Sequence, residues 1–360
     1  MKMNSTKSSE RKASNRILTS FESFCYKFRY IFAILYVVLV FLTPYMGISL
    51  VNVQLLMLIG LYAVLGMGLN VLIGYTGQVS LGHAGFYAIG AYTCALLMTR
   101  LGVNFWPALL IAGAFTAFIG FLLGLPSLRL SGSYLSIVTL GFCEIVNMIL
   151  KQWEAVTNGN YGVRGIPKPS IFGYELTMFN GGLLIFVLLL MGITGVACLA
   201  MRNSNTGRAW RAIKDDELAA GMMGIHTSRY KIMSFVVSAF ITGIAGGFYC
   251  ITRDYIEPNN FVFNTSILIL SVVIVGGLGT VRGMIFGAAL LQLFPQWFRF
   301  LNEWRFVVYG LLLVLMMLFR PQGALGWRST QPFHLSKAAK KLMAAKGEPE
   351  DPAPAPTVSE

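Results

Sequence analysis

Long apolar runs alternate with short polar segments along most of this 360-residue chain. From Tyr30 to Thr99, seventy consecutive residues include no Asp, Glu, Lys or Arg, and no soluble core could hide such a run. A helix that crosses a bilayer needs about 20 largely apolar residues, whereas a barrel strand needs only about 10. The pattern therefore predicts an all-α fold, a polytopic transmembrane helical bundle with about ten spans. The expected spans are 31–46, 52–73, 86–99, 106–124, 134–150, 181–201, 232–252, 264–278, 284–300 and 305–319.

Basic residues gather in three places beside these apolar runs. Residues 1–29 contain seven Lys and Arg, residues 202–231 contain six, and residues 320–346 contain six. Such clusters mark cytoplasmic loops and meet anionic lipid head groups, so the net charge of +13 does not indicate nucleic-acid binding. An even number of spans returns the C-terminus to the side of the N-terminus. We therefore expect both termini and residues 202–231 to be cytoplasmic.

Composition divides the chain into three parts. A basic N-terminal segment, 1–29, precedes a transmembrane domain, 30–327, and a tail, 328–360, follows it. The tail ends in a stretch rich in Pro, Ala and acidic residues, which predicts disorder. Two polar connections, 151–180 and 253–263, fall on the outer side in this topology. The first is long enough to dock a partner, and a packed surface cap is the alternative interpretation.

Two predicted spans are interrupted by glycine. The first break, 74–85, reads GYTGQVSLGHAG, and the second, 275–283, reads VGGLGTVRG. They align without gaps at an offset of 202 residues, which is a weak internal repeat. Interrupted helices in internal repeats are typical of transporters, so we predict a pathway or hinge role, with close helix packing as the alternative. The residues predicted for this role are Gly74, Tyr75, Gly77, Gln78, Ser80, His83, Gly276, Gly277 and Gly279.

No catalytic, cofactor or metal site is expected. The three histidines lie far apart, the five cysteines lack ligand or disulfide spacing, and no phosphate-binding loop occurs. Ser80 and His83 lie three residues apart, but no carboxylate is near them in sequence to complete a nucleophilic site. The pattern indicates a transport protein rather than an enzyme, and any ATP hydrolysis would belong to a separate chain.

Glu144 is the only acidic residue within a predicted span. An ionisable residue at membrane depth is a candidate for function, so Glu144 is assigned to the pathway, with pairing inside the bundle as the alternative. It would also be the coupling acid if the chain were an ion-coupled secondary transporter. A passive channel for a small neutral solute such as urea is a third class.

A polar segment, 202–231, separates two apolar runs that contain no charged residue. We predict a helix over 206–224, capped by Asn205 or Thr206 and ended by Gly224, with a stripe of small residues along one side. Such a helix could seat in the groove of a partner protein or lie on the membrane surface. The residues predicted to couple to a partner are Arg208, Ala209, Arg211, Ala212, Asp215, Ala219, Ala220 and Gly224.

This segment resembles the cytoplasmic loop through which ABC importer permeases dock their ATPase. The signature Glu-Ala-Ala-x3-Gly is matched by Ala219, Ala220 and Gly224, whereas Leu218 stands where the family has Glu. Five separated blocks extend the resemblance to the branched-chain amino acid permease family, of the Liv-M subunit type. The blocks are 74–93, 126–145, 206–225, 275–290 and 318–326.

The resemblance implies a permease subunit of an ATP-driven importer of branched-chain amino acids in a bacterial inner membrane. The implied partners are a second homologous permease subunit, two ABC ATPase subunits and a periplasmic substrate-binding protein, together with membrane lipid. A urea or amide permease is the nearest alternative within the same superfamily. The stretch 166–169 favours the amino acid branch.

Overall fold

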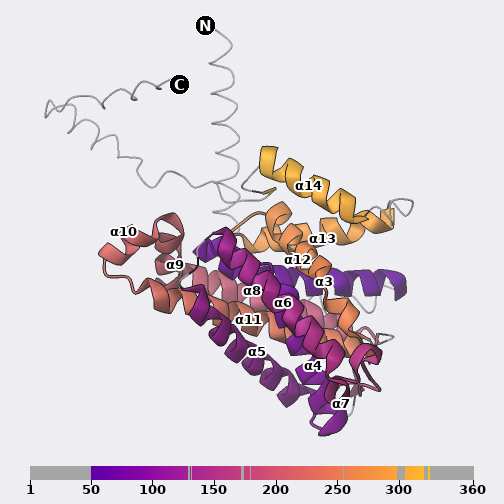
Figure 1. The fold of residues 1–360 in the computed structure, drawn as a ribbon. Helices are drawn as coiled ribbons and strands as arrows, with labels where there is room; N and C mark the ends of the chain where they lie inside the picture. Colours follow the sequence, from indigo (N-terminus) through magenta and orange to yellow (C-terminus); the bar gives the residue numbers. More distant parts are fainter. Residues whose placement is uncertain are drawn as a thin grey trace, which may run out of the picture. The chain divides into compact units, whose positions relative to one another are not determined.

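The computed structural model describes residues 50–128, 130, 132–171, 174–178, 180–253, 255–297, 305–319 and 323–324. The N-terminal segment 1–29, the first expected span 31–46 and the tail 328–360 lie outside these residues. The described part is built from helices, with two small sheets of two-residue strands at one end of the bundle (Figure 1).

The longer helices follow the predicted spans from 52–73 onward. They are α3 (Leu50–Asn70) continued by the π-helical turn η2 (Val71–Tyr75), α4 (His83–Arg100), α5 (Phe105–Ser127), α6 (Ser133–Gln152), α8 (Gly182–Asn203), α11 (Thr227–Thr252), α12 (Phe263–Gly276), α13 (Val281–Trp297) and α14 (Arg305–Phe319). The shorter elements are α7 (Glu154–Thr157), η3 (Gly159–Tyr161), α9 (Asn205–Asp215), α10 (Glu217–Met222) and η4 (Pro258–Phe261). The strands are β1 (Val163–Arg164), β2 (Ser170–Ile171), β3 (Tyr174–Glu175) and β4 (Tyr255–Ile256).

Among the residues that the structure describes, five helices are long and apolar enough to cross a membrane: Leu50–Tyr75, α5, α6, α8 and α11. Two further apolar helices, α12 and the first part of α13, are shorter. The 14 residues of α12 rise about 21 Å, less than the roughly 30 Å of a bilayer core. These properties confirm a polytopic helical membrane protein.

Helix α11 lies at the centre of the bundle, against α3, α4 and α5. Glycine allows this close approach, because a Cβ atom on Gly90 of α4 would collide with the backbone of Gly243 on α11. A Cβ on Gly246 would likewise collide with the carbonyl oxygen of Tyr87. Helices in membranes associate through small residues of this kind, since the lipid supplies no hydrophobic driving force between them.

The two polar connections predicted on the outer side pack together at the end of the bundle opposite α9 and α10 (Figure 1). Strand β1 pairs antiparallel with β4, so that Val163 faces Ile256. The Asn147 side chain of α6 donates to the Pro258 carbonyl at 2.8 Å, which ties this cap to the bundle. Within the described residues, the packed-cap interpretation is therefore correct for this part of the chain.

We expect Gly90→Ala to lower the free energy of unfolding by about 1–3 kcal/mol, because the added methyl overpacks a backbone–backbone contact. The measurement is the thermal midpoint of the detergent-solubilised protein. The matched control is Gly221→Ala on α10, where a Cβ would meet nothing within 4 Å. Equal midpoints for the two variants would show that the α4–α11 contact does not depend on glycine.

Candidate functional site

The polar segment 202–231 forms two helices rather than the single helix predicted over 206–224. The Ser204 hydroxyl caps α9 by accepting from the amide of Gly207 at 3.3 Å, so the predicted caps Asn205 and Thr206 are wrong. Asp216 lies extended between the helices, and its carboxylate accepts from the amides of Leu218 and Ala219 at 2.9 and 3.0 Å. A carboxylate at this position is a strong N-cap, and it starts α10 where a continuous helix was expected.

The C-terminal end of α10 agrees better with the sequence. Helix α10 ends at Met222, and Gly224 adopts a left-handed backbone with φ of 82°. The amide of Ile225 returns to the carbonyl of Ala220 at 3.1 Å, which closes the helix end. Only glycine takes this conformation without strain, so Gly224 ends the helical segment as predicted.

A buried aromatic residue that sequence analysis did not single out seats α9 on the bundle. Trp210 is fully buried, donates its indole N–H to the Tyr230 carbonyl at 2.9 Å, and stacks on Tyr75 with ring centroids 6.3 Å apart. Ala209 and Ile213 are buried beside it. The spacing of Trp210 and Ile213, three residues apart in a charged segment, was the available signal for an inward face.

Lys214 connects α9 directly to the first glycine break. Its ammonium nitrogen donates to the Gly74 carbonyl oxygen at 2.8 Å. In a continuing α-helix that carbonyl would accept from the amide of Gln78, but this amide donates to the Leu72 carbonyl instead, at 3.0 Å. The break thus frees a carbonyl group, and the lysine satisfies it. Burial lowers the pKa of the Lys214 ammonium, and the charge of Asp215 opposes this shift.

The two glycine breaks that align in sequence also touch in space. The Asn70 side-chain oxygen accepts from the Gly279 amide at 2.8 Å, and a Cβ on Gly74 would lie 2.7 Å from that same nitrogen. In the second break, Gly276 packs on the backbone of Gly283, and Gly277 packs on that of Gly323. The amide of Ala324 donates to the Val275 carbonyl at 2.9 Å. Lys214, Asn70 and the two breaks therefore form one continuous structure, which we call the coupling node.

The first break continues to His83, which is fully buried at the start of α4. The Ser238 hydroxyl donates to the Gly68 carbonyl at 2.6 Å, so it accepts from His83 Nε2, 2.8 Å away. This network assigns the proton to Nε2. The Ser80 hydroxyl accepts from the Gly82 amide at 3.4 Å, and no hydrogen bond among the described residues joins it to His83. The arrangement supports a packing role for His83 and no nucleophile.

Other predicted site residues lie around this node or apart from it. Tyr75 lies under Trp210, its hydroxyl 3.4 Å from the Cys198 carbonyl, and Gln78 is buried. Arg208, Arg211, Asp215 and Ala219 are exposed on α9 and α10, whereas Ala209 and Ala220 are buried and Ala212 is half-buried. The small residues therefore do not form one exposed stripe, because α10 turns away from α9 at Asp216.

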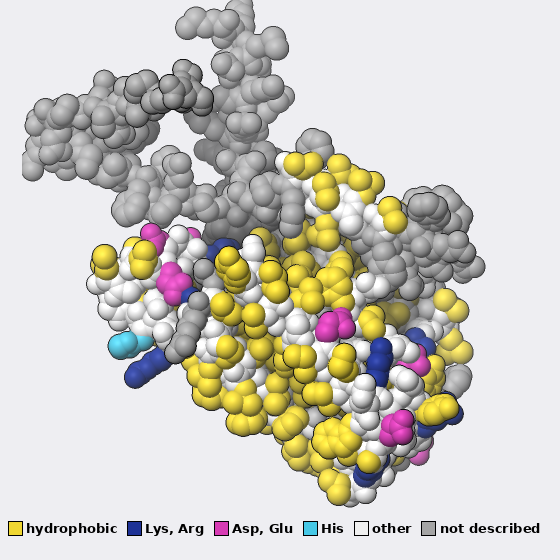
Figure 2. Space-filling view, viewed as in Figure 1, with side chains coloured by type: hydrophobic (Ala, Val, Ile, Leu, Met, Phe, Trp, Pro, Cys, Tyr) yellow, Lys and Arg dark blue, Asp and Glu magenta, His cyan; other side chains and the backbone are white. Residues whose placement is uncertain are grey.

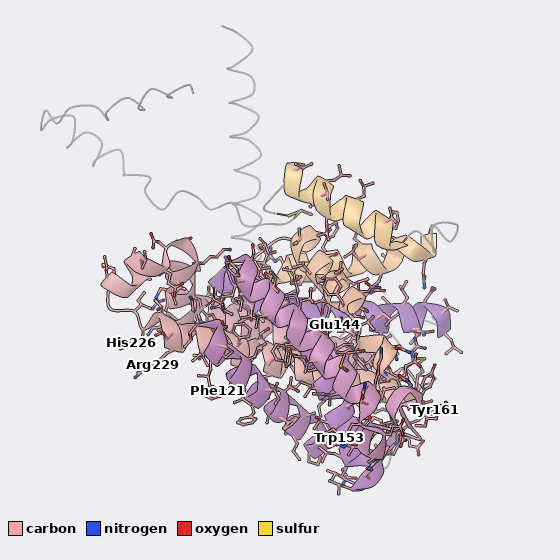
Figure 3. The ribbon with its side chains drawn as sticks, viewed as in Figure 1. Phe121, Glu144, Trp153, Tyr161, His226 and Arg229 are labelled. Atoms are coloured by element: carbon pink, nitrogen blue, oxygen red, sulfur yellow. The ribbon has the colours of Figure 1, made fainter. Side chains whose placement is uncertain are left out.

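Two further acidic residues lie apart from the coupling node. Glu217 is three residues from Lys214, but it forms an ion pair with Lys231 at the start of α11. Glu144 lies outside the coupling node, exposed near the middle of α6 (Figure 3). The opposite side of α6 holds the first break, because Thr139 Oγ1 accepts from the Leu81 amide at 3.0 Å.

A polytopic helical bundle with interrupted helices, and with a polar helix hydrogen-bonded to one of the interruptions, defines a membrane transport permease. Comparison with known proteins gives the family. The chain belongs to the family described as "Branched-chain amino acid transport system / permease component", whose model matches residues 51–317. It is therefore a permease component of such a system, as the resemblance implied, and not an enzyme.

Two curated relatives are high-affinity branched-chain amino acid transport system permease proteins LivM. The Escherichia coli protein is 38% identical over 340 residues, covering 88% of this chain and 78% of the relative. The Salmonella typhimurium protein is 36% identical over 304 residues, covering 78% and 71% respectively. The LivH permease of Escherichia coli is 26% identical over 196 residues, covering 50% of this chain and 61% of the relative. No solved structure matches the chain significantly.

We expect Lys214→Met to loosen the first break, because the Gly74 carbonyl loses its donor while the aliphatic stem of the side chain is kept. Loss of one hydrogen bond from a charged donor costs about 1.5–3 kcal/mol. Hydrogen exchange of the amides between Gly77 and Gly82 should accelerate accordingly. The control is Lys168→Met in the cap, where the lysine is exposed. Unchanged hydrogen exchange in Lys214→Met would show that the bond from α9 does not stabilise the first glycine break.

Proposed function

We propose that this chain is the permease subunit of an ATP-driven ABC importer that carries branched-chain amino acids across a bacterial inner membrane. The observation that carries the proposal is the bond between Lys214 and Gly74. It joins a polar helix outside the apolar bundle to a helix interruption inside it. A protein that moves α9 from the water phase therefore acts directly on the coupling node.

In this proposal the chain has ten spans, with both termini and α9 and α10 in the cytoplasm. The basic segment 1–29 and the tail 328–360 flank the permease domain 30–327 on that side. The family membership and the charge of residues 202–231 support this orientation. The partners are a second homologous permease subunit, two ABC ATPase subunits and a periplasmic substrate-binding protein. Similarity to both LivM and LivH proteins fits a pair of related permeases.

We place the ATPase contact on the tip of α10 and the adjacent exposed side of α9. Leu218, Met222 and Met223 are 80%, 90% and 84% exposed, although all three are large and apolar. Large apolar side chains that project from the surface of a polar segment are typical of a protein contact. Of the residues predicted from the signature, Ala219 and Gly224 remain at this contact. Ala209 and Ala220 are buried and hold the helices on the bundle.

The mechanism is alternating access. Closure of the ATPase pair on ATP moves α10 and α9 together, since the two helices join directly at Asp216. The Glu217–Lys231 ion pair and the stacking of Trp210 on Tyr75 connect them to the bundle. Lys214 transmits the movement to Gly74, and the contact with Gly279 carries it to the second break. Irregular backbone at membrane depth exists only inside protein or along a water-filled path, so movement of the breaks changes the access of that path.

The proposal is tested by uptake of labelled leucine into vesicles that contain the complete complex. We expect uptake that requires ATP, the ATPase and the binding protein, and that does not follow an imposed ion gradient. Labelled urea is the competing cargo in the same vesicles. Uptake driven by an ion gradient without the ATPase would instead assign the chain to secondary transport, and uptake of urea alone would change the substrate.

The docking surface is tested by Met222→Glu and Met223→Glu, each combined with Leu218→Glu. We expect the variants to insert into the membrane normally but to retain less than about a tenth of the co-purified ATPase, because charge replaces the apolar contact. The control is Tyr161→Glu in η3, a 78% exposed aromatic at the opposite end of the bundle. Full retention of the ATPase by the α10 variants would show that the tip of α10 does not bind the ATPase.

A further inference from the structure

Helix α6 has two different sides. One side packs on the bundle through Leu135, Thr139, Cys143, Val146 and Asn147. The other side is an exposed stripe at a spacing of three and four residues, which we call the α6 face. Its large apolar members are Tyr134, Ile137, Val138, Ile145, Met148 and Ile149. Glu144 lies in the middle of this stripe and is labelled in Figure 3, and Figure 2 shows large hydrophobic areas on this side of the molecule.

The Glu144 carboxylate distinguishes the α6 face from the outward side of α5, which we call the lipid-type face. The outward side of α5 carries large apolar side chains such as Leu110, Phe115 and Phe118, as a helix facing lipid should. A carboxylate in mid-span facing hydrocarbon is unfavourable, and such groups face a bundle interior or a water-filled path. Among the described residues, no side chain forms a hydrogen bond or an ion pair with Glu144. Its partner therefore comes from outside this chain's described part.

A glycine lies one turn from the carboxylate, and we call the open space beside it the recess. Gly141 is three residues before Glu144, and a Cβ atom placed on it would meet nothing within 4 Å. Packing inside the described bundle therefore does not require glycine at this position, and the space opens outward onto the α6 face. Ile137 and Ile145 lie four residues to either side of Gly141, so they flank the recess on the same face of the helix. A carboxylate, a glycine with open space beside it and branched aliphatic side chains thus occur together on the α6 face.

The α6 face also borders the first glycine break. The Ser136 hydroxyl of α6 donates to the Val79 carbonyl at 3.2 Å, and Val79 is itself 38% exposed. Thr139 and Gly82 are in contact on the packed side of α6. A molecule held at Glu144 would therefore lie on the other side of α6 from the first glycine break. By moving along the α6 face, it would reach Val79 in that break.

We propose that the α6 face lines the translocation path and that the Glu144 carboxylate binds the ammonium group of the amino acid in transit. The recess at Gly141, flanked by Ile137 and Ile145, takes the branched aliphatic side chain of the same molecule. The second permease subunit forms the opposite wall of the path. This inference rests on the proposed function and adds to it the chemical group of the substrate that the permease itself recognises.

The first test is leucine uptake by the complete complex with Glu144→Gln, which keeps the shape of the side chain and removes its charge. Loss of a charge-assisted hydrogen bond predicts a decrease in kcat/KM of about tenfold or more. Glu144→Asp should recover part of the loss. The matched control is Glu154→Gln on α7, an exposed acid beyond the end of α6. Co-purification of the second subunit should stay unchanged in all variants, and leucine uptake and basal ATPase activity should stay unchanged in the Glu154→Gln control.

The outcomes are distinguishable. If the native complex shows no ATP-driven leucine uptake, the proposed function fails and this inference fails with it. If the native complex transports leucine and Glu144→Gln does so equally well, only the ammonium site is wrong. If Glu144→Gln no longer co-purifies with the second subunit, the carboxylate forms an ion pair between subunits and the ammonium site is likewise excluded.

A second test does not remove the carboxylate. Gly141→Cys places a thiol in the recess, where a side chain meets no neighbour. In a chain that carries Cys25→Ser, the four other native cysteines are buried and give little background. We expect a charged, water-soluble methanethiosulfonate reagent to modify Gly141→Cys in the assembled complex, and leucine to slow the reaction during turnover. The control is Phe118→Cys on the lipid-type face of α5. Equal, slow reaction at both positions would exclude a water-filled path along α6.

Discussion

The hydrogen bond from the Lys214 ammonium to the Gly74 carbonyl oxygen is the interaction on which the proposed transport mechanism depends. It exists because the chain leaves the helix after Tyr75, and the amide of Gln78 is used by Leu72. An unsatisfied carbonyl group at membrane depth is costly, so a donor must come from elsewhere. That donor comes from a helix outside the bundle, which couples the geometry of the break to the position of α9.

The same constraint explains the polar residues buried around the two breaks. The Gly279 amide donates to the side-chain oxygen of Asn70. The Leu81 and Ala84 amides donate to the hydroxyl groups of Thr139 and Ser266 respectively. Each side chain replaces one backbone hydrogen bond that the interruption removed. These bonds join α3, α6 and α12 to the interruptions, so a displacement at one break would strain hydrogen bonds to several helices. The glycines add to this, because their backbones touch directly.

The residues on the outer surface of the bundle depend on a different constraint. Each surface must be compatible with the lipid, solvent or protein that covers it. The side of α5 that faces outward is apolar throughout its middle, which suits hydrocarbon. The α6 face combines apolar residues with Glu144 and the recess at Gly141, which suits a path shared with water and substrate. The tip of α10 carries exposed large apolar side chains next to the charged helix α9, which suits a contact with another protein. Three kinds of surface thus indicate three kinds of neighbour.

The sequence alone was sufficient for the helical membrane class, the positions of the glycine breaks, the isolated polar segment and the family resemblance. Each of these depends on composition or on local spacing, because hydrophobic length and backbone freedom are properties of short segments. Hydrogen-bond and ion-pair partners that lie far apart in the sequence could not be predicted in this way. Lys214 shares a helix face with Glu217 by spacing, yet it bonds to Gly74, 140 residues away, while Glu217 pairs with Lys231. The capping carboxylate of Asp216 turns α10 away, and the packing of α9 on Tyr75 brings Lys214 to the break. The exposure of Glu144 and the burial of Trp210 were likewise decided by how the helices pack, since spacing defines the faces of a helix but not which face meets the bundle.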